Sequence, residues 1–112
     1  MKNLSEIDGK ILELGNKDYS IVLCPNMAAD TDDLGNINYR KQIINIDTDL
    51  TKHPEEMLEV VLHEIQHGLN ERFGLMHIKD EEQFTNQQAI ALSTVILRNK
   101  WLADFIAIAA KG

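Results

Sequence analysis

The sequence predicts an α+β fold in which a small antiparallel β-sheet from the N-terminal half packs against two or three α-helices. Three observations support this. Residues 10–47 hold four short strand-like runs separated by turn-forming residues, and apolar residues then recur at helical spacing. The change of period falls at His53-Pro54, where proline favours a helix start. At 112 residues the chain has the length of one domain, so we expect a single domain over residues 1–112.

Two hairpins are expected in the N-terminal half. The runs KILEL and YSIVLC lie on either side of Gly15-Asn16-Lys17-Asp18, whose residue types favour a turn. The runs INYR and QIINID form a second pair around Lys41. Strands are therefore expected between about residues 10 and 47.

The segment between the two hairpins, residues 25–36, is rich in Asp, Asn and Gly. Its carboxylates at Asp30, Asp32 and Asp33 resemble a calcium loop only superficially, because the ligand spacing and the closing Glu of an EF-hand are missing. We therefore interpret it as a solvated loop.

The C-terminal half is expected to be helical. Pro54 at a first helical position and acids in the first turn predict a helix over about 54–73 that ends near Gly74. A second helix is expected over about 80–98, with Phe84, Ala91, Leu92 and Val95 on its buried face. A break near Asn99 precedes a third helical piece over about 101–110. The apolar positions of the first helix are Leu58, Val61, Leu62, Ile65, Leu69 and Phe73.

Composition excludes several classes of function. The chain has 11 Lys and Arg against 18 Asp and Glu, which gives a net charge of −7 and no basic run, so nucleic acid and anionic membranes are not expected partners. Cys24 is the single cysteine, and the N-terminal residues MKNLSEIDGK lack the apolar core of a secretory signal. The longest nearly apolar stretch contains Asp104 and is shorter than the ~20 residues of a membrane span. We therefore expect a cytoplasmic protein.

The first predicted helix contains His63-Glu64-Ile65-Gln66-His67, an H-E-x-x-H motif. Histidines at i and i+4 project side by side, so both imidazoles can bind one Zn²⁺ at ~2.0–2.1 Å. The intervening Glu64 can reach a metal-bound water as general base. On a helical wheel both histidines lie about 140–180° from the centre of the apolar stripe, which excludes them from the core.

A catalytic zinc needs a third protein ligand and an open position. A metzincin would supply a histidine at position 73, which is Phe73, so that class is excluded. On the second helix, Glu82 and Asn86 share one side. We assign Glu82 as the third metal ligand and Asn86 as the hydrogen-bonding residue behind a ligand. Glu81, Asp80 and His77 remain open alternatives to Glu82.

These residues resemble a known family. HEIQHGL, followed by EQFTNQQAIAL and then LRNKWL, is similar to the ImmA/IrrE-type metallopeptidases, in particular to the short versions encoded by phages and prophages of Gram-positive bacteria. The resemblance spans residues 36 to about 102. The family's second-helix pattern, E-x-E-A-N-x-F-A, places Glu82 on its first Glu and Phe84 on its second. The resemblance implies a zincin-like minimal fold, zinc-dependent peptide hydrolysis and, for a phage protein, the cytoplasm of the bacterial host.

The sequence therefore favours a zinc metallopeptidase with one Zn²⁺ per chain and a peptide or protein substrate. The alternative is a catalytically silent zinc-binding or metal-free protein of a phage or mobile element that acts as a protein-binding module. A peptidase also needs a group that stabilises the oxyanion. Tyr19, Tyr39, His53 and His77 are the candidates by residue type.

Overall fold

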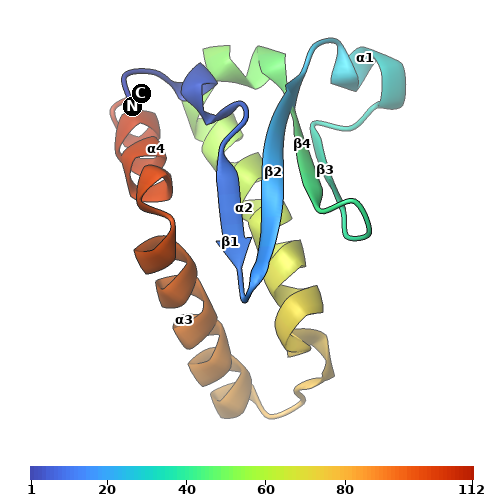
Figure 1. The fold of residues 1–112 in the computed structure, drawn as a ribbon, viewed down its shortest axis with the longest axis vertical. Helices are drawn as coiled ribbons and strands as arrows, with labels where there is room; N and C mark the ends of the chain where they lie inside the picture. The colour runs from blue at the N-terminus through green and yellow to red at the C-terminus, as the bar shows by residue number, and fades with distance from the viewer.

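Four strands form one sheet, in the order β1-β2-β4-β3, in a computed structural model that describes residues 1–112 (Figure 1). β1 pairs with β2 and β3 with β4 as the two expected antiparallel hairpins, but β2 and β4 are parallel. The fold class is confirmed as α+β, and the expected antiparallel sheet is instead a mixed one. The strands are β1 Ile11–Leu14, β2 Lys17–Cys24, β3 Gly35–Asn38 and β4 Ile43–Asp47.

The parallel contact follows from the connection between the hairpins. Residues 25–34, which include the short helix α1 (Met27–Thr31), carry the chain past the position of β4 to the outer edge of the sheet. β3 comes first in the chain and forms this edge. β4 follows it and lies between β3 and β2, where Ile44 pairs with Ile21. The segment expected to be a solvated loop thus contains one short helix.

Three long helices follow, and their expected bounds are confirmed to within a residue. α2 (Pro54–Phe73) ends at Gly74, whose φ of 62° is a left-handed conformation that glycine adopts without strain. α3 (Glu81–Arg98) and α4 (Lys100–Ala110) are separated by Asn99. The short 3-10 helices are η1 Leu4–Ile7, η2 Thr48–Lys52 and η3 Leu75–His77. None of the helices combines the length and apolar character that a membrane span needs.

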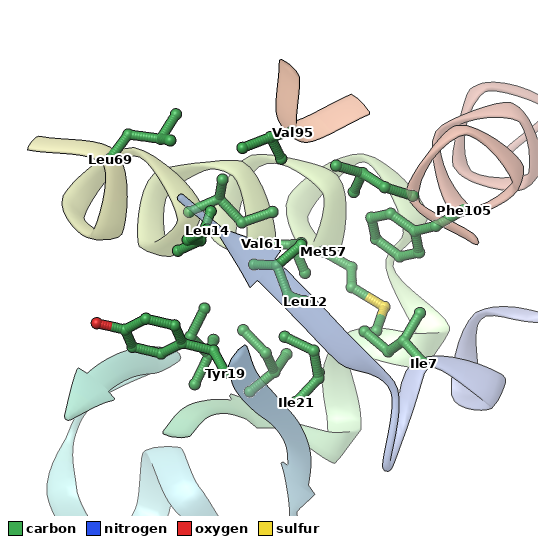
Figure 2. Packing of buried hydrophobic residues seen from close by; sticks show 14 of the residues in the cluster. Ile7, Leu12, Leu14, Tyr19, Ile21, Met57, Val61, Leu69, Val95 and Phe105 are labelled. Carbon is green, nitrogen blue, oxygen red and sulfur yellow. The ribbon is translucent and has the colours of Figure 1, made fainter. Parts of the chain in front are cut away.

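The core lies between α2 and the sheet. Leu12 and Leu14 of β1 meet Val61 of α2, as Figure 2 shows, and Phe105 of α4 closes one end of the same cluster. The cluster contains 19 buried residues from both halves of the chain. Burial of these side chains fixes α2 on the sheet, and α2 carries the H-E-x-x-H motif.

β3 approaches α2 very closely. A Cβ at Gly35 would lie 2.7 Å from Cγ1 of Val60, so any larger residue there forces this side chain or the strand to shift. A Cβ at Gly68 would lie 2.6 Å from Cδ1 of Leu14 in β1 and 3.3 Å from Cδ1 of Ile37 in β3. β3 pairs with β4 on one edge only. In Figure 1, α3 and α4 lie on the β1 side of the molecule, at the opposite edge of the sheet. The outer edge of β3 therefore carries main-chain groups without a strand partner beside the middle of α2.

Asn99 joins the α3–α4 break to the β1 edge of the sheet. Its side chain accepts a hydrogen bond from the main-chain N–H of Glu13 (2.7 Å) and donates to the carbonyls of Glu13 and Val95 (2.9 Å each).

Replacing this side chain in Asn99→Ala leaves these buried groups unpaired, so we expect the free energy of unfolding to fall by about 1–3 kcal/mol. Urea denaturation measures this. Gln83→Ala, at an exposed position of α3, should change stability by less than about 0.5 kcal/mol; equal losses in both variants would contradict the role of Asn99.

Candidate active site

His63 and His67 lie on successive turns of α2 with their rings turned toward each other. Their Nε2 atoms are 3.1 Å apart, and the rings meet edge to face with centroids 4.6 Å apart. Two nitrogens bound to a tetrahedral zinc at ~2.0–2.1 Å would be about 3.3–3.4 Å apart. Both side chains are exposed to solvent. The pair is thus within a few tenths of an ångström of the separation that zinc requires, at a place that solvent can reach.

Glu64 lies beside this pair but is buried, with 6% of its surface exposed. It packs against β3, where its Cγ is 3.3 Å from the position of a Cβ on Gly35. Burial raises the pKa of this carboxyl group, while the charges of His63 and His67 oppose the rise and that of Asp33 adds to it. No hydrogen bond to the carboxylate is present. A desolvated carboxylate without a partner is suited to accept a proton.

Two hollows open on either side of the histidine pair. The first, which we call the acidic hollow, has a volume of about 310 Å³ and contains His63 and Glu64 in its wall. The second, the His67 hollow, has a volume of about 390 Å³. The acidic hollow is lined by Asp32, Asp33, Leu34, Gly35, Glu59, Val60, His63 and Glu64, and the His67 hollow by Tyr39, His67, Asn70, Glu71, Gly74, Met76 and His77. β3 begins at the first hollow, and the turn that follows β3 reaches the second.

The structure brings two of the four candidate oxyanion-stabilising residues to this site. The hydroxyl of Tyr39 donates to the main-chain carbonyl of His67 (3.4 Å), and His77 lines the same hollow. His53 precedes α2 and lies about 15 Å from His63 along the helix axis, given a rise of 1.5 Å per residue. Tyr19 is fully buried in the core.

Glu82 and Asn86 lie exposed on the first two turns of α3. α3 meets α2 through Gln88, whose side-chain amide donates to Gln66 (3.0 Å). With 3.6 residues per turn, Glu82 is about 120° around α3 from Gln88, whereas Glu81 is only about 20° from it. Glu81 is therefore on the side that faces α2, and Glu82 is not.

No group of three His, Cys, Asp or Glu side chains converges closely enough to hold a metal ion. Two of the three sequence-predicted ligands, His63 and His67, stand together. Neither Glu82 nor the alternatives Glu81, Asp80 and His77 completes the set in this conformation. The histidine pair fits zinc, and the identity of the third ligand stays a sequence prediction.

The sequence analysis missed three acids of the site. Asp32 and Asp33 lie in the segment expected to be a solvated loop, and Glu59 had no role predicted from the sequence, yet all three line the acidic hollow. Glu59 had a detectable signal, because it precedes His63 by four residues and so shares its face of α2. Asp32 and Asp33 had no such signal in the sequence, because only the connection between β2 and β3 places them beside α2.

Comparison of the chain with known proteins identifies no relative. No family model, no curated protein and no solved structure matches the chain. The resemblance to the ImmA/IrrE-type peptidases therefore stands on the motif residues alone.

Tyr19 carries the one fully buried side-chain polar atom without a hydrogen-bond partner, its hydroxyl oxygen. Figure 2 shows this oxygen pointing away from Ile21. Removing it in Tyr19→Phe should raise the free energy of unfolding by about 1 kcal/mol at pH 7. Burial raises the pKa of this phenol above its usual value near 10, so above that pH the unfolded chain loses the proton first and wild-type stability falls.

The gain from Tyr19→Phe should therefore widen above pH 10, as measured by urea denaturation across pH. Tyr39→Phe is the matched control, because that hydroxyl has a partner, and it should bring no gain at pH 7. A loss of stability in Tyr19→Phe at pH 7 would show that the hydroxyl has a partner after all.

Proposed function

We propose that this protein is a zinc-dependent metallopeptidase of the ImmA/IrrE type. The observation that carries the proposal is the pairing of His63 and His67, with Nε2 atoms 3.1 Å apart, next to the buried and unpartnered carboxylate of Glu64. Imidazole nitrogens are ordinary zinc ligands, and a glutamate that is not a ligand but borders the metal position suits a general base.

His63 and His67 would hold the metal through their Nε2 atoms. When bound there, zinc would supply a Lewis acid that polarises a substrate carbonyl and lowers the pKa of a water toward ~7. Glu64 accepts a proton from the water that attacks the carbonyl carbon, and it passes this proton to the nitrogen as the C–N bond breaks. The products are a carboxylate and an amine. Burial of Glu64 favours the first step, because a carboxylate with a raised pKa is a stronger proton acceptor.

The substrate would lie along β3. An extended peptide can pair with the unpartnered edge of a strand, and this edge passes Glu64 at Gly35. The scissile carbonyl then comes beside the histidine pair, between the two hollows. Tyr39 and His77, which line the same hollow as His67, are the candidates to donate to the developing oxyanion.

A second candidate function is a silent protein-binding module, and the lack of a converged third ligand favours it. Glu64 favours catalysis, because a structural zinc site closes its fourth position with a protein ligand and has no use for a buried base. The two candidate functions predict different effects of the Glu64→Gln substitution.

The purified protein should carry about one zinc per chain by elemental analysis, as expected of a mononuclear site. His63→Ala and His67→Ala should abolish this zinc, because each removes a ligand. Glu64→Gln should keep the zinc but lower hydrolysis of a quenched fluorescent peptide library by about 10²–10⁴-fold, because it removes only the base. A zinc-free wild-type protein whose Tm ignores added zinc would contradict the proposal.

The third ligand can be assigned with a matched pair of neighbouring acids. The sequence assignment requires Glu82→Gln to lower zinc occupancy and Glu81→Gln to leave it unchanged, whereas the rotation of α3 given by the Gln66–Gln88 contact favours the reverse. Competition with a chromophoric chelator measures the zinc affinity of each. Loss of affinity in Glu81→Gln alone would overturn the assignment and move it to the acid that faces α2.

A further inference from the structure

One side of α3 is exposed, partly apolar and free of charge. On a helical wheel, Ile90 and Leu97 are about 20° apart and lie opposite Gln88, the residue through which α3 meets α2. Their exposed fractions are 59% and 76%. Positions 83–97 hold no charged residue, although 26% of the whole chain is charged. In Figure 1, α3 lies at the margin of the molecule, with α2 and the sheet on one side of it only. We call this side the outer face of α3 and define it as Asn86, Ile90, Ser93 and Leu97.

A third hollow opens beside the outer face, between α3 and the β1–β2 turn. This α3 hollow has a volume of about 240 Å³, and its wall contains Phe73, Ile90 and Val95. Pockets for small molecules usually have volumes of about 300–1,000 Å³, so the α3 hollow is better suited to one apolar side chain. Leu97 is the most exposed large apolar side chain of the protein and lies on the same helix. A surface that carries both a hollow and a protruding side chain can be complementary to itself.

An antiparallel pair of α3 helices related by a twofold axis matches these features. If the axis passes between Ser93 and Thr94, Leu97 of each copy lies opposite Ile90 of the other, because the two residues are equally far from the axis along the helix. Ile90 is part of the wall of the α3 hollow, so Leu97 of the second copy comes to its mouth.

Ser93 and Thr94 can be buried at the centre of such a pair at little cost. Both hydroxyls already donate to the main-chain carbonyl of Ile90, at 3.0 and 2.8 Å. The penalty for burying a hydroxyl arises mainly when its proton is left without an acceptor. The polar residues at the centre of the face therefore do not oppose its burial.

The charges at the two ends of α3 favour a second copy as the occupant. Asp80, Glu81 and Glu82 stand at its start, whereas Arg98 and Lys100 stand at its end. An antiparallel pair brings the acidic start of each copy toward the basic end of the other, and a parallel pair would bring like charges together. Two of the three acids remain for this contact when one of them binds zinc. Elsewhere, two chains of net charge −7 repel each other.

We propose that the outer face of α3 binds a second copy of this chain, in an antiparallel pair in which Leu97 of each copy enters the α3 hollow of the other. The inference does not rest on the proposed function, because it uses neither histidine of the H-E-x-x-H motif nor Glu64. The helix is about 27 Å long and about 10–12 Å wide, a footprint of about 300 Å². Stable complexes bury about 800 Å² on each partner, so this dimer is of the weak, concentration-dependent class.

Sedimentation equilibrium of the full-length protein, from about 10 µM to 1 mM, measures the association. The average mass should rise with concentration toward that of two chains. The Ile90→Ser, Leu97→Ser double variant should weaken the association by at least about tenfold, because each copy loses two apolar contacts. A wild-type protein that stays monomeric over the whole range would overturn the proposal, as would an unchanged Kd in the double variant.

Met76→Ser is the matched control. Met76 is 73% exposed, almost as much as Leu97, but it lines the His67 hollow and lies outside α3. This variant should associate as the wild-type protein does. A loss of association as large as that of the double variant would show that any exposed apolar side chain drives it, and would overturn the assignment to α3.

Disulfide cross-linking tests the antiparallel arrangement. Ile90→Cys and Leu97→Cys are made separately in a Cys24→Ser background, mixed in equal amounts and oxidised with oxidised glutathione. Peptide mass mapping should find disulfides from position 90 of one copy to position 97 of the other in excess over 90–90 and 97–97 disulfides, because only the antiparallel pair places the first two positions together. An excess of 90–90 and 97–97 disulfides would contradict the proposal.

Discussion

The close contact between β3 and α2 is the constraint on which the site depends. Gly35 lacks the side chain that would hold β3 away from α2, so the strand lies directly over Val60 and Glu64. The same contact buries the Glu64 carboxylate and leaves the two histidines, farther round the helix, in solvent. It also places an unpaired strand edge where an extended substrate would have to lie. One packing arrangement thus separates a largely buried base from an exposed pair of candidate metal ligands.

Burying an acid without a partner destabilises the folded state, and a protein of this size tolerates the loss only if its hydrophobic core is large. Here the cost falls on α2, which also carries the most extensive apolar contacts, from Met57 to Leu69. The buried hydroxyl of Tyr19, which has no hydrogen-bond partner, is a second such cost.

Local signals in the sequence were sufficient for most of the fold. Pro54, Gly74 and Asn99 mark helix ends through backbone preferences that act over a few residues, and the structure has its helices between them. The H-E-x-x-H spacing predicted the side-by-side histidines for the same reason.

The features that the sequence did not predict depend on contacts between residues far apart in the chain. Nothing within either hairpin specifies that β4 pairs parallel to β2, and the same crossover puts Asp33 beside Glu64. The assignment of Glu82 as the third ligand stays a prediction, because the direction of Glu82 depends on how α3 is rotated against α2, and the wheel of α3 alone does not give that rotation.

The central claim is that one zinc ion binds between His63 and His67, and anomalous diffraction at the zinc edge tests it most directly. Crystals would be grown with one equivalent of zinc per chain. We expect a single anomalous peak about 2.0–2.1 Å from Nε2 of both histidines. A map with no peak at this position, or with zinc bound only at His53 or His77, would contradict the metal site and with it the proposed peptidase.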